Sequence, residues 1–502
     1  MTTSATKVIL PKIIQGGMGI GVSNWDLARA VASRGQMGVV SGTALDSVLA
    51  RRLQLGDEAG DLRRALSQFP WPAMAGRVRD RYFVPGGKLP GLPFRNNSMV
   101  SEKLSRDVAE LLIVANFVEV YLAKEGHEGL VGINYLEKVQ RPTLPSLLGA
   151  MLARVDAILM GAGIPLAIPG ILDKLAKWEE VELKLTVIEN PDVRSVTQSF
   201  NPAKFLEGPP IELKRPLFLA IISSETLAKT FERRASGFTD GFIVENYTAG
   251  GHNAPPRRDR NASTEPNQYG PKDVPDLAAI AEIGRPFWLA GSYASPERFG
   301  EALESGATGV QLGSIFALSD ESGIMPSLKR RLIDDFLRGN LKIRTDFEAS
   351  PTGFPFKIAE LEETAGKPTG FDERPRICDM GYLREMLVSS EGKTAYRCAA
   401  EPVADFERKG GPVEATERRI CLCNGLMATI GLGQVRAGGP ELPLVTAGDD
   451  FSFLHSVLRS GESSYTASEA IDYVMGEDRV KIGSNGSEDP ARRPEIAHHS
   501  TG

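Results

Sequence analysis

Residues 241–257 read GFIVENYTAGGHNAPPR, and this stretch decides the interpretation of the fold. Its first five residues, 241–245, form an apolar run of strand length, which is followed by the pair Gly250-Gly251 and by His252. Glycines let backbone N–H groups approach a ligand closely, and histidine transfers protons near neutral pH. A single histidine after a strand is more often a structural residue than a catalytic one. The unit of strand, glycine turn and polar residue therefore becomes informative only if it recurs.

The same unit recurs along the first two thirds of the chain. Short apolar runs alternate with helix-like stretches, and most of the runs are followed by glycine. This alternation predicts an α/β fold, a (β/α)8 TIM barrel, rather than an open doubly wound sheet. In a barrel the loops after the strands form the active face, so these loops are expected to converge. The runs lie at residues 12–15, 37–40, 130–134, 157–160, 217–222, 241–245, 286–290 and 308–312.

Local signals add detail to the barrel. Asn24 is expected to cap one helix, and Ser295-Pro296-Glu297 has the cap and first-turn proline of another. Residues 327–337 are interpreted as the closing helix of the barrel. Residues 69–94, which are rich in aromatic residues and proline, are expected to form a loop or lid. Residues 182–187 are expected to be an extra strand outside the main repeat.

The chain exceeds the usual length of one domain, which predicts a large domain with a smaller appended one. We expect the barrel to span residues 1–340, with long insertions at about 69–122 and 172–216. A smaller α-rich C-terminal extension follows at residues 341–476 and contains all four cysteines. From residue 477 onward the chain is polar and is expected to be a disordered tail.

The charge balance argues against two classes of partner. With 64 acidic and 58 basic residues the net charge is −6, which offers no attraction to nucleic acid or to an anionic membrane. No apolar run approaches membrane-spanning length, and the N-terminus lacks the apolar core of a signal peptide. A cytoplasmic enzyme with a small-molecule substrate is the expectation. The oligomeric state stays open, a homo-oligomer included.

Small residues follow the last two predicted strands. In many barrels the loops after strands seven and eight bind phosphate through backbone N–H groups. Ala290-Gly291-Ser292 and Gln311-Leu312-Gly313-Ser314 have the glycines and hydroxyls that this use requires. Either loop alone is equally typical of ordinary turn chemistry. Together with Gly250-Gly251, the two loops predict a phosphorylated cofactor.

The ordered combination of these motifs resembles the nitronate monooxygenase (2-nitropropane dioxygenase) family. That family consists of FMN-dependent barrels, and it also contains flavin-dependent enoyl reductases and NADH:quinone reductases. The resemblance covers residues 12–319 of the chain. It rests on five segments: IQGGM at 14–18, VGIN at 131–134, AGGH at 249–252, AGS at 290–292 and GVQLGS at 309–314.

The resemblance implies roles for individual residues. His252 matches the catalytic histidine, Met18 would lie beside the isoalloxazine ring, and Asn134 would hydrogen-bond the flavin. Three positions depart from the family pattern: Gly16-Gly17 replaces Ala-Pro, Glu245 replaces a common glutamine, and Ser292 replaces a common glycine. The full set of implied cofactor-binding residues is Gly17, Met18, Asn134, Glu245, Gly250, Gly251, Gly291, Ser292, Gln311, Leu312, Gly313 and Ser314.

The implied activity is FMN-dependent oxidation of alkyl nitronates with O2. His252 would take the α-proton of a neutral nitroalkane, or hydrogen-bond the nitro oxygens, while FMN carries the redox step. The alternative is an NAD(P)H-dependent flavin reductase that acts on an enoyl thioester or a quinone, including a role in polyunsaturated fatty acid or polyketide synthesis. A barrel without enzymatic activity, whose extension binds a partner, is the third interpretation.

The cysteines allow a separate hypothesis. Cys378, Cys398, Cys421 and Cys423 could together ligate a structural zinc, although a single residue between Cys421 and Cys423 is tight for two ligands of one metal. An iron–sulfur cluster is a further option. Buried, unligated thiols are the favoured interpretation.

Overall fold

The computed structural model describes residues 10–188, 195–257, 267–367, 374–389, 391–459 and 462–477. Apart from Glu477, the predicted tail lies outside the described residues. In the described ranges, no helix combines the length and the apolar character that crossing a membrane requires.

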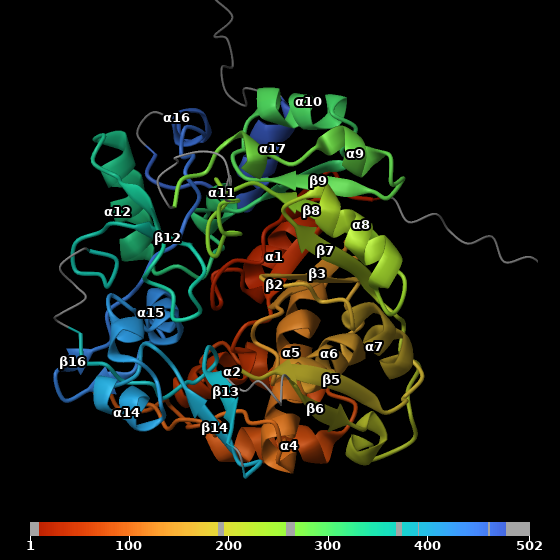
Figure 1. Ribbon diagram of the computed structural model, residues 1–502, viewed down its shortest axis with the longest axis vertical. Coiled ribbons are helices and arrows are strands. Elements are labelled where there is room, and N and C mark those ends of the chain that lie inside the picture. Colours follow the sequence, from red (N-terminus) through yellow and green to blue (C-terminus); the bar gives the residue numbers. More distant parts are fainter. Residues whose placement is uncertain are drawn as a thin grey trace, which may run out of the picture.

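Eight parallel strands form a (β/α)8 barrel, as predicted (Figure 1). The order around the barrel is β1-β10-β9-β8-β7-β4-β3-β2. A parallel bridge between Ile14 and Met37 joins the first and last strands and closes the ring. The strands are β1 (Ile13–Gln15), β2 (Gly38–Ser41), β3 (Val131–Leu136), β4 (Ala157–Gly161), β7 (Leu217–Ile222), β8 (Gly241–Glu245), β9 (Phe287–Ala290) and β10 (Gly309–Leu312).

The strand β8 shows how the barrel separates two cores. Successive side chains of a strand point to opposite faces. Ile243 belongs to the cluster inside the barrel, with Ile14 and Trp288, whereas Phe242 and Val244 belong to the large cluster outside it. The interior is therefore packed with side chains, and ligands have access only at the ends of the strands.

Helices surround the strands, and the predicted caps are confirmed. The side chain of Asn24 accepts the N–H of Leu27 at 2.8 Å, and Ser295 accepts that of Arg298 at 3.3 Å. The helices are α1 (Trp25–Ser33), α2 (Leu45–Gln54), α3 (Asp61–Ser67), α4 (Pro72–Tyr82), α5 (Arg106–Lys124), α6 (Thr143–Leu152), α7 (Ile168–Leu175), α8 (Glu225–Arg234), α9 (Leu277–Ala281), α10 (Pro296–Glu304), α11 (Ser314–Ala317) and α12 (Pro326–Leu337).

The loop or lid predicted at residues 69–94 is wrong over much of its length. Residues Pro72–Tyr82 form α4, which buries Met74, Val78 and Tyr82. Pro72 occupies the first turn of this helix, where the missing N–H of proline costs nothing. The proline that suggested a loop is therefore a helix start.

The prediction that residues 327–337 close the barrel is also wrong. Figure 1 shows α12 on the side of the C-terminal extension, away from α1 and α10. The helix that contacts α1, α10 and α11 is instead α17 (Ala467–Met475), from the end of the described chain. An amphipathic pattern shows that a helix has a buried face but not what covers it, which is why the sequence could not distinguish the two helices.

The predicted extra strand is confirmed as β5 (Val181–Thr186), which pairs only with β6 (Ser195–Phe200) in a separate antiparallel sheet of the described chain. The C-terminal extension mixes short hairpins with short helices and shares one hydrophobic core with the barrel. Its remaining elements are β11 (Ile343–Asp346), β12 (Phe356–Ala359), β13 (Glu385–Val388), β14 (Thr394–Arg397), β15 (Val435–Arg436), β16 (Gly439–Pro440), α14 (Val403–Arg408), α15 (Leu422–Thr429) and α16 (Leu454–Val457).

Candidate active site

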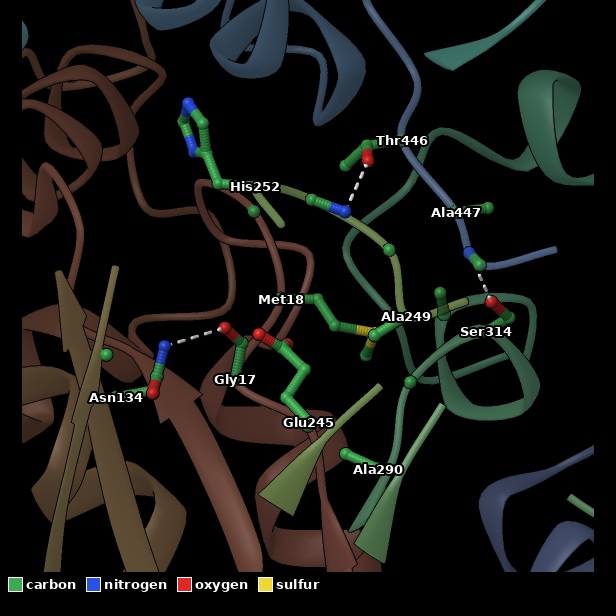
Figure 2. A pocket seen from close by; sticks show the side chains of 18 of the residues that line it. Gly17, Met18, Asn134, Glu245, Ala249, His252, Ala290, Ser314, Thr446 and Ala447 are labelled. Atoms are coloured by element: carbon green, nitrogen blue, oxygen red, sulfur yellow. Dashed lines mark hydrogen bonds between the residues drawn. The ribbon is translucent and has the colours of Figure 1, made fainter. Parts of the chain in front are cut away.

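A cavity of about 230 Å³ lies at the carboxyl ends of the barrel strands (Figure 2). Because all eight strands are parallel, their following loops meet at this one end. Every predicted catalytic or cofactor-binding residue lines the cavity: Gly17, Met18, Asn134, Glu245, Gly250, Gly251, His252, Gly291, Ser292, Gln311, Leu312, Gly313 and Ser314.

The loop after β1 forms one wall of the cavity, and Ser23 holds it in place. The hydroxyl of Ser23 donates to the carbonyl of Gly16 at 2.7 Å and accepts the N–H of Met18 at 2.9 Å. Gly17 packs directly on Asn134, and a Cβ at Gly17 would lie 2.2 Å from the Cβ of Asn134. The glycine that departs from the family pattern is therefore required by this contact.

Asn134 presents an unpaired acceptor in this wall. Its Nδ2 donates to the carbonyl of Gly17 at 3.2 Å, while its buried Oδ1 has no hydrogen-bond partner among the described residues. A buried polar atom without a partner costs about 1–3 kcal/mol. A ligand N–H at this position would remove that cost.

The loops after β8, β9 and β10 form the end of the cavity beside Met18. Gly291 has a φ of 103°, and a Cβ there would lie 2.7 Å from the Oγ1 of Thr248. That hydroxyl is buried and, in the described chain, unpaired. The backbone N–H groups of Ser292, Gly313 and Ser314 donate no hydrogen bond within the described ranges. This end of the cavity thus offers donors without partners.

The extension supplies a further part of the lining, which sequence reasoning missed. Part of it is an apolar roof that consists of Leu383, Leu422, Leu426, Phe356 and Phe453. Four residues of the segment 446–450 also line the cavity: Thr446, Ala447, Gly448 and Asp450. The sequence signal for this segment is weak, because the tripeptide Thr-Ala-Gly at 248–250 recurs at 446–448 but also at 364–366.

His252 is held by the extension. Its Nε2 lies 2.8 Å from the Oγ of Ser350, and its ring packs against that of Phe356, with a centroid separation of 4.8 Å. Burial, assisted by the charge of Lys138, lowers the pKa of His252 well below its usual value, so the imidazole is neutral at pH 7. In Figure 2 the ring points away from Met18 and Glu245.

Glu245 and Lys138 are buried ionisable groups, and the charge of each affects the pKa of the other. Burial raises the pKa of Glu245 to about 7, and the charge of Lys138 works against this rise. Burial also lowers the pKa of Lys138 to about 7, while Glu137 and Glu245 oppose the fall. The Nζ of Lys138 lies 3.8 Å from the ring centroid of Phe354 and has no hydrogen-bond partner among the described residues. Lys138 carried no sequence signal, since it follows β3 in an unremarkable polar turn.

The cysteines are free thiols in the extension, and only Cys423 of the four lines the cavity. Burial raises the pKa of Cys421 and of Cys423. Over the described ranges, no group of three or more His, Cys, Asp or Glu residues is arranged to hold a metal ion. The zinc and iron–sulfur alternatives therefore find no ligand geometry in this part of the chain.

Comparisons with known proteins give similarity in structure alone. No family model matches the sequence, and neither does any curated protein. The nitroalkane oxidase of Streptomyces ansochromogenes is 14% identical, with 94% of this chain and 96% of that chain covered at a TM-score of 0.46. FabK from Thermotoga maritima is 14% identical, with coverages of 93% and 92% and a TM-score of 0.44. The enoyl reductase domain of MlnA from Bacillus amyloliquefaciens is 11% identical, with coverages of 92% and 93% and a TM-score of 0.44.

Proposed function

We propose that the protein is an FMN-dependent oxidoreductase. The observation that carries the proposal is the buried, unpaired Oδ1 of Asn134, a residue that lines the same cavity as Ser292, Gly313 and Ser314, whose N–H groups donate no hydrogen bond within the described ranges. An acceptor at one end and several donors at the other suit a ligand with a ring N–H and a phosphate. Glycines at both ends leave room for close approach of the ligand.

The residues present fit this cofactor. Asn134 would accept from the ring, with Met18 and Glu245 beside it, and the loops after β9 and β10 would donate to the phosphate. From the sequence we expected Gly251 to bind the cofactor, but its N–H already donates to the Oγ1 of Thr446 at 2.9 Å and is not available as a donor to the phosphate. When bound, FMN supplies the electron transfer of the reaction.

The preferred reaction within this class is oxidation of alkyl nitronates with O2. A neutral His252 supports it, because only an unprotonated imidazole accepts a proton. With its Nε2–H donated to Ser350, the imidazole would keep a lone pair on Nδ1 for the α-proton of a nitroalkane. The contact with Phe356 would keep the ring in one orientation.

A specific observation favours the second candidate, an NAD(P)H-dependent reductase of an enoyl thioester or quinone. The roof formed by Leu383, Leu422, Leu426, Phe356 and Phe453 is apolar and would shield a hydrocarbon chain from water. A small nitronate has no need of such a surface. The roof therefore supports a substrate with an apolar part.

Anaerobic mixing of the FMN-loaded protein with each reductant tests both candidates. Bleaching of the flavin absorbance by an alkyl nitronate alone supports nitronate oxidation, and rapid bleaching by NADH or NADPH supports the reductase. A protein that is colourless as isolated and does not bind added FMN would refute the proposed function altogether. Absorbance at the flavin maximum is the measurement in every case.

A further inference from the structure

The segment Thr446–Asp450 of the extension runs along the barrel loop Thr248–Gly251 at the edge of the cavity (Figure 2). Backbone N–H groups join the two. The N–H of Gly251 donates to the Oγ1 of Thr446 at 2.9 Å, and the N–H of Asp449 donates to the carbonyl of Thr248 at 3.0 Å. The N–H of Gly448 donates to the Oγ of Ser314 at 2.9 Å, which ties the segment to a second barrel loop.

The two backbones are in direct contact. A Cβ at Gly250 would lie 2.8 Å from the carbonyl carbon of Ala447, and a Cβ at Gly448 would lie 3.0 Å from the carbonyl oxygen of Thr248. No side chain therefore stands between the segment and the loop at these two positions. Gly250 of the loop and Gly448 of the segment both line the cavity. A ligand bound to the N–H groups of Ser292, Gly313 and Ser314 would therefore lie behind two layers of backbone.

An ion pair with a buried ammonium group fastens the segment. The Nζ of Lys357, on β12, lies 2.6 and 2.7 Å from the two carboxylate oxygens of Asp449. The side chain of Lys357 is only 4% exposed, whereas that of Asp449 is 38% exposed. Moving the segment outward would leave a buried ammonium without its counter-charge, which is strongly unfavourable. Lys357 also donates its backbone N–H to the carbonyl of Gly251 at 2.9 Å, so β12 anchors both layers.

We infer that the segment Thr446–Asp450 is a retaining wall of the cofactor site, fastened by the Lys357–Asp449 ion pair, and that it must open for the phosphate end of the cofactor to leave. The inference rests on the proposed function, with a flavin phosphate as the retained ligand. It assigns a task to the C-terminal extension, which is to slow cofactor release.

The test is the release rate of FMN from the full-length, FMN-loaded protein, followed by flavin fluorescence with an excess of an apo-flavoprotein as trap. Asp449→Asn removes the counter-charge of the buried Lys357, and we expect release to be about tenfold faster or more, because opening the wall then no longer breaks an ion pair. Glu362→Gln is the matched control, since it removes the partner of the exposed Lys367. The control should release FMN at the wild-type rate.

Two further measurements keep the outcome decisive. Thr446→Val removes the acceptor of the Gly251 N–H without disturbing the ion pair, and it should also release FMN faster than the wild type. This variant provides the test if Asp449→Asn does not fold. Amide hydrogen exchange at Gly251 and Gly448 should accelerate in Asp449→Asn but not in the control. If the wild type binds FMN and the folded variants release it no faster, the inference is overturned and the proposed function stands. If the wild type binds no FMN, both are overturned.

Discussion

Replacement of Gly17 by alanine tests the geometry of the candidate site most directly. The added methyl would lie 2.2 Å from the Cβ of Asn134, whereas carbon atoms in contact are about 3.5–4.0 Å apart. One of the two residues must therefore move by more than about 1 Å. The free protein can relieve the clash by displacing Asn134, which breaks its hydrogen bond to Gly17.

The cost should appear in the affinity for FMN. If the cofactor needs Asn134 where it now stands, binding must restore the strain, and over-packing of this kind costs about 1–3 kcal/mol. A value of about 2 kcal/mol corresponds to an affinity about 30-fold weaker. Fluorescence quenching during titration of the apoprotein with FMN measures the dissociation constant.

Gly76 provides the matched control, because it lies inside α4 and a Cβ added there would meet no atom within 4 Å beyond the backbone of its own helix. Gly76→Ala should leave the dissociation constant unchanged and stabilise the helix by about 0.5–1 kcal/mol. Wild-type affinity in Gly17→Ala would refute the placement of Asn134 against the cofactor. Equal losses in both variants would show that the effect is not specific to the site.

Three further predictions concern the charged groups and the thiols. Because burial raises the folded-state pKa of Glu245 to about 7, its carboxyl holds a proton that the unfolded chain loses above about 4.5, and stability should fall as pH rises between these values. Glu245→Gln should remove that fall and raise the free energy of unfolding at pH 7 by at most about 3 kcal/mol. Denaturant titration at pH 5 and pH 7 measures both proteins. A difference in unfolding free energy between variant and wild type that is the same at both pH values would contradict the assignment. His252→Asn with FMN bound should oxidise a preformed nitronate but turn over the neutral nitroalkane at least about 100-fold more slowly, in steady-state assays of oxygen consumption; equal slowing on both substrates would exclude a role confined to proton abstraction. Metal analysis of the isolated protein should find less than about a tenth of an equivalent of zinc or iron, since a tetrahedral site needs four ligands and no group of three is arranged for a metal in the described chain.

The strands and the helix caps could be read from the sequence because their causes are local. Asn24 and Ser295 cap helices through bonds to residues three positions ahead, and β8 is recognised from five consecutive residues. The convergence of Gly17, Asn134, His252 and Gly313 on one cavity also followed, because parallel strands of a barrel end on the same side.

Contacts between distant segments were beyond local patterns. His252 contacts Ser350 and Phe356, which lie about 100 residues further along the chain. Lys357 and Asp449 are also separated by about 100 residues. Nothing in the sequence around Lys138 indicates that its Nζ is buried under Phe354 near Glu245. A pKa depends on burial and on neighbouring charges, and both are properties of the packed chain.

The sequence by itself therefore determined the barrel, the face on which the site lies and the residue types that the barrel brings to it, because backbone periodicity and strand direction are set within short stretches. Only the tertiary structure decided that α17 rather than α12 completes the helix ring, that the extension roofs the cavity, and that His252 is neutral. These outcomes depend on which apolar faces and charges meet across hundreds of residues, and many such pairings share the same local pattern.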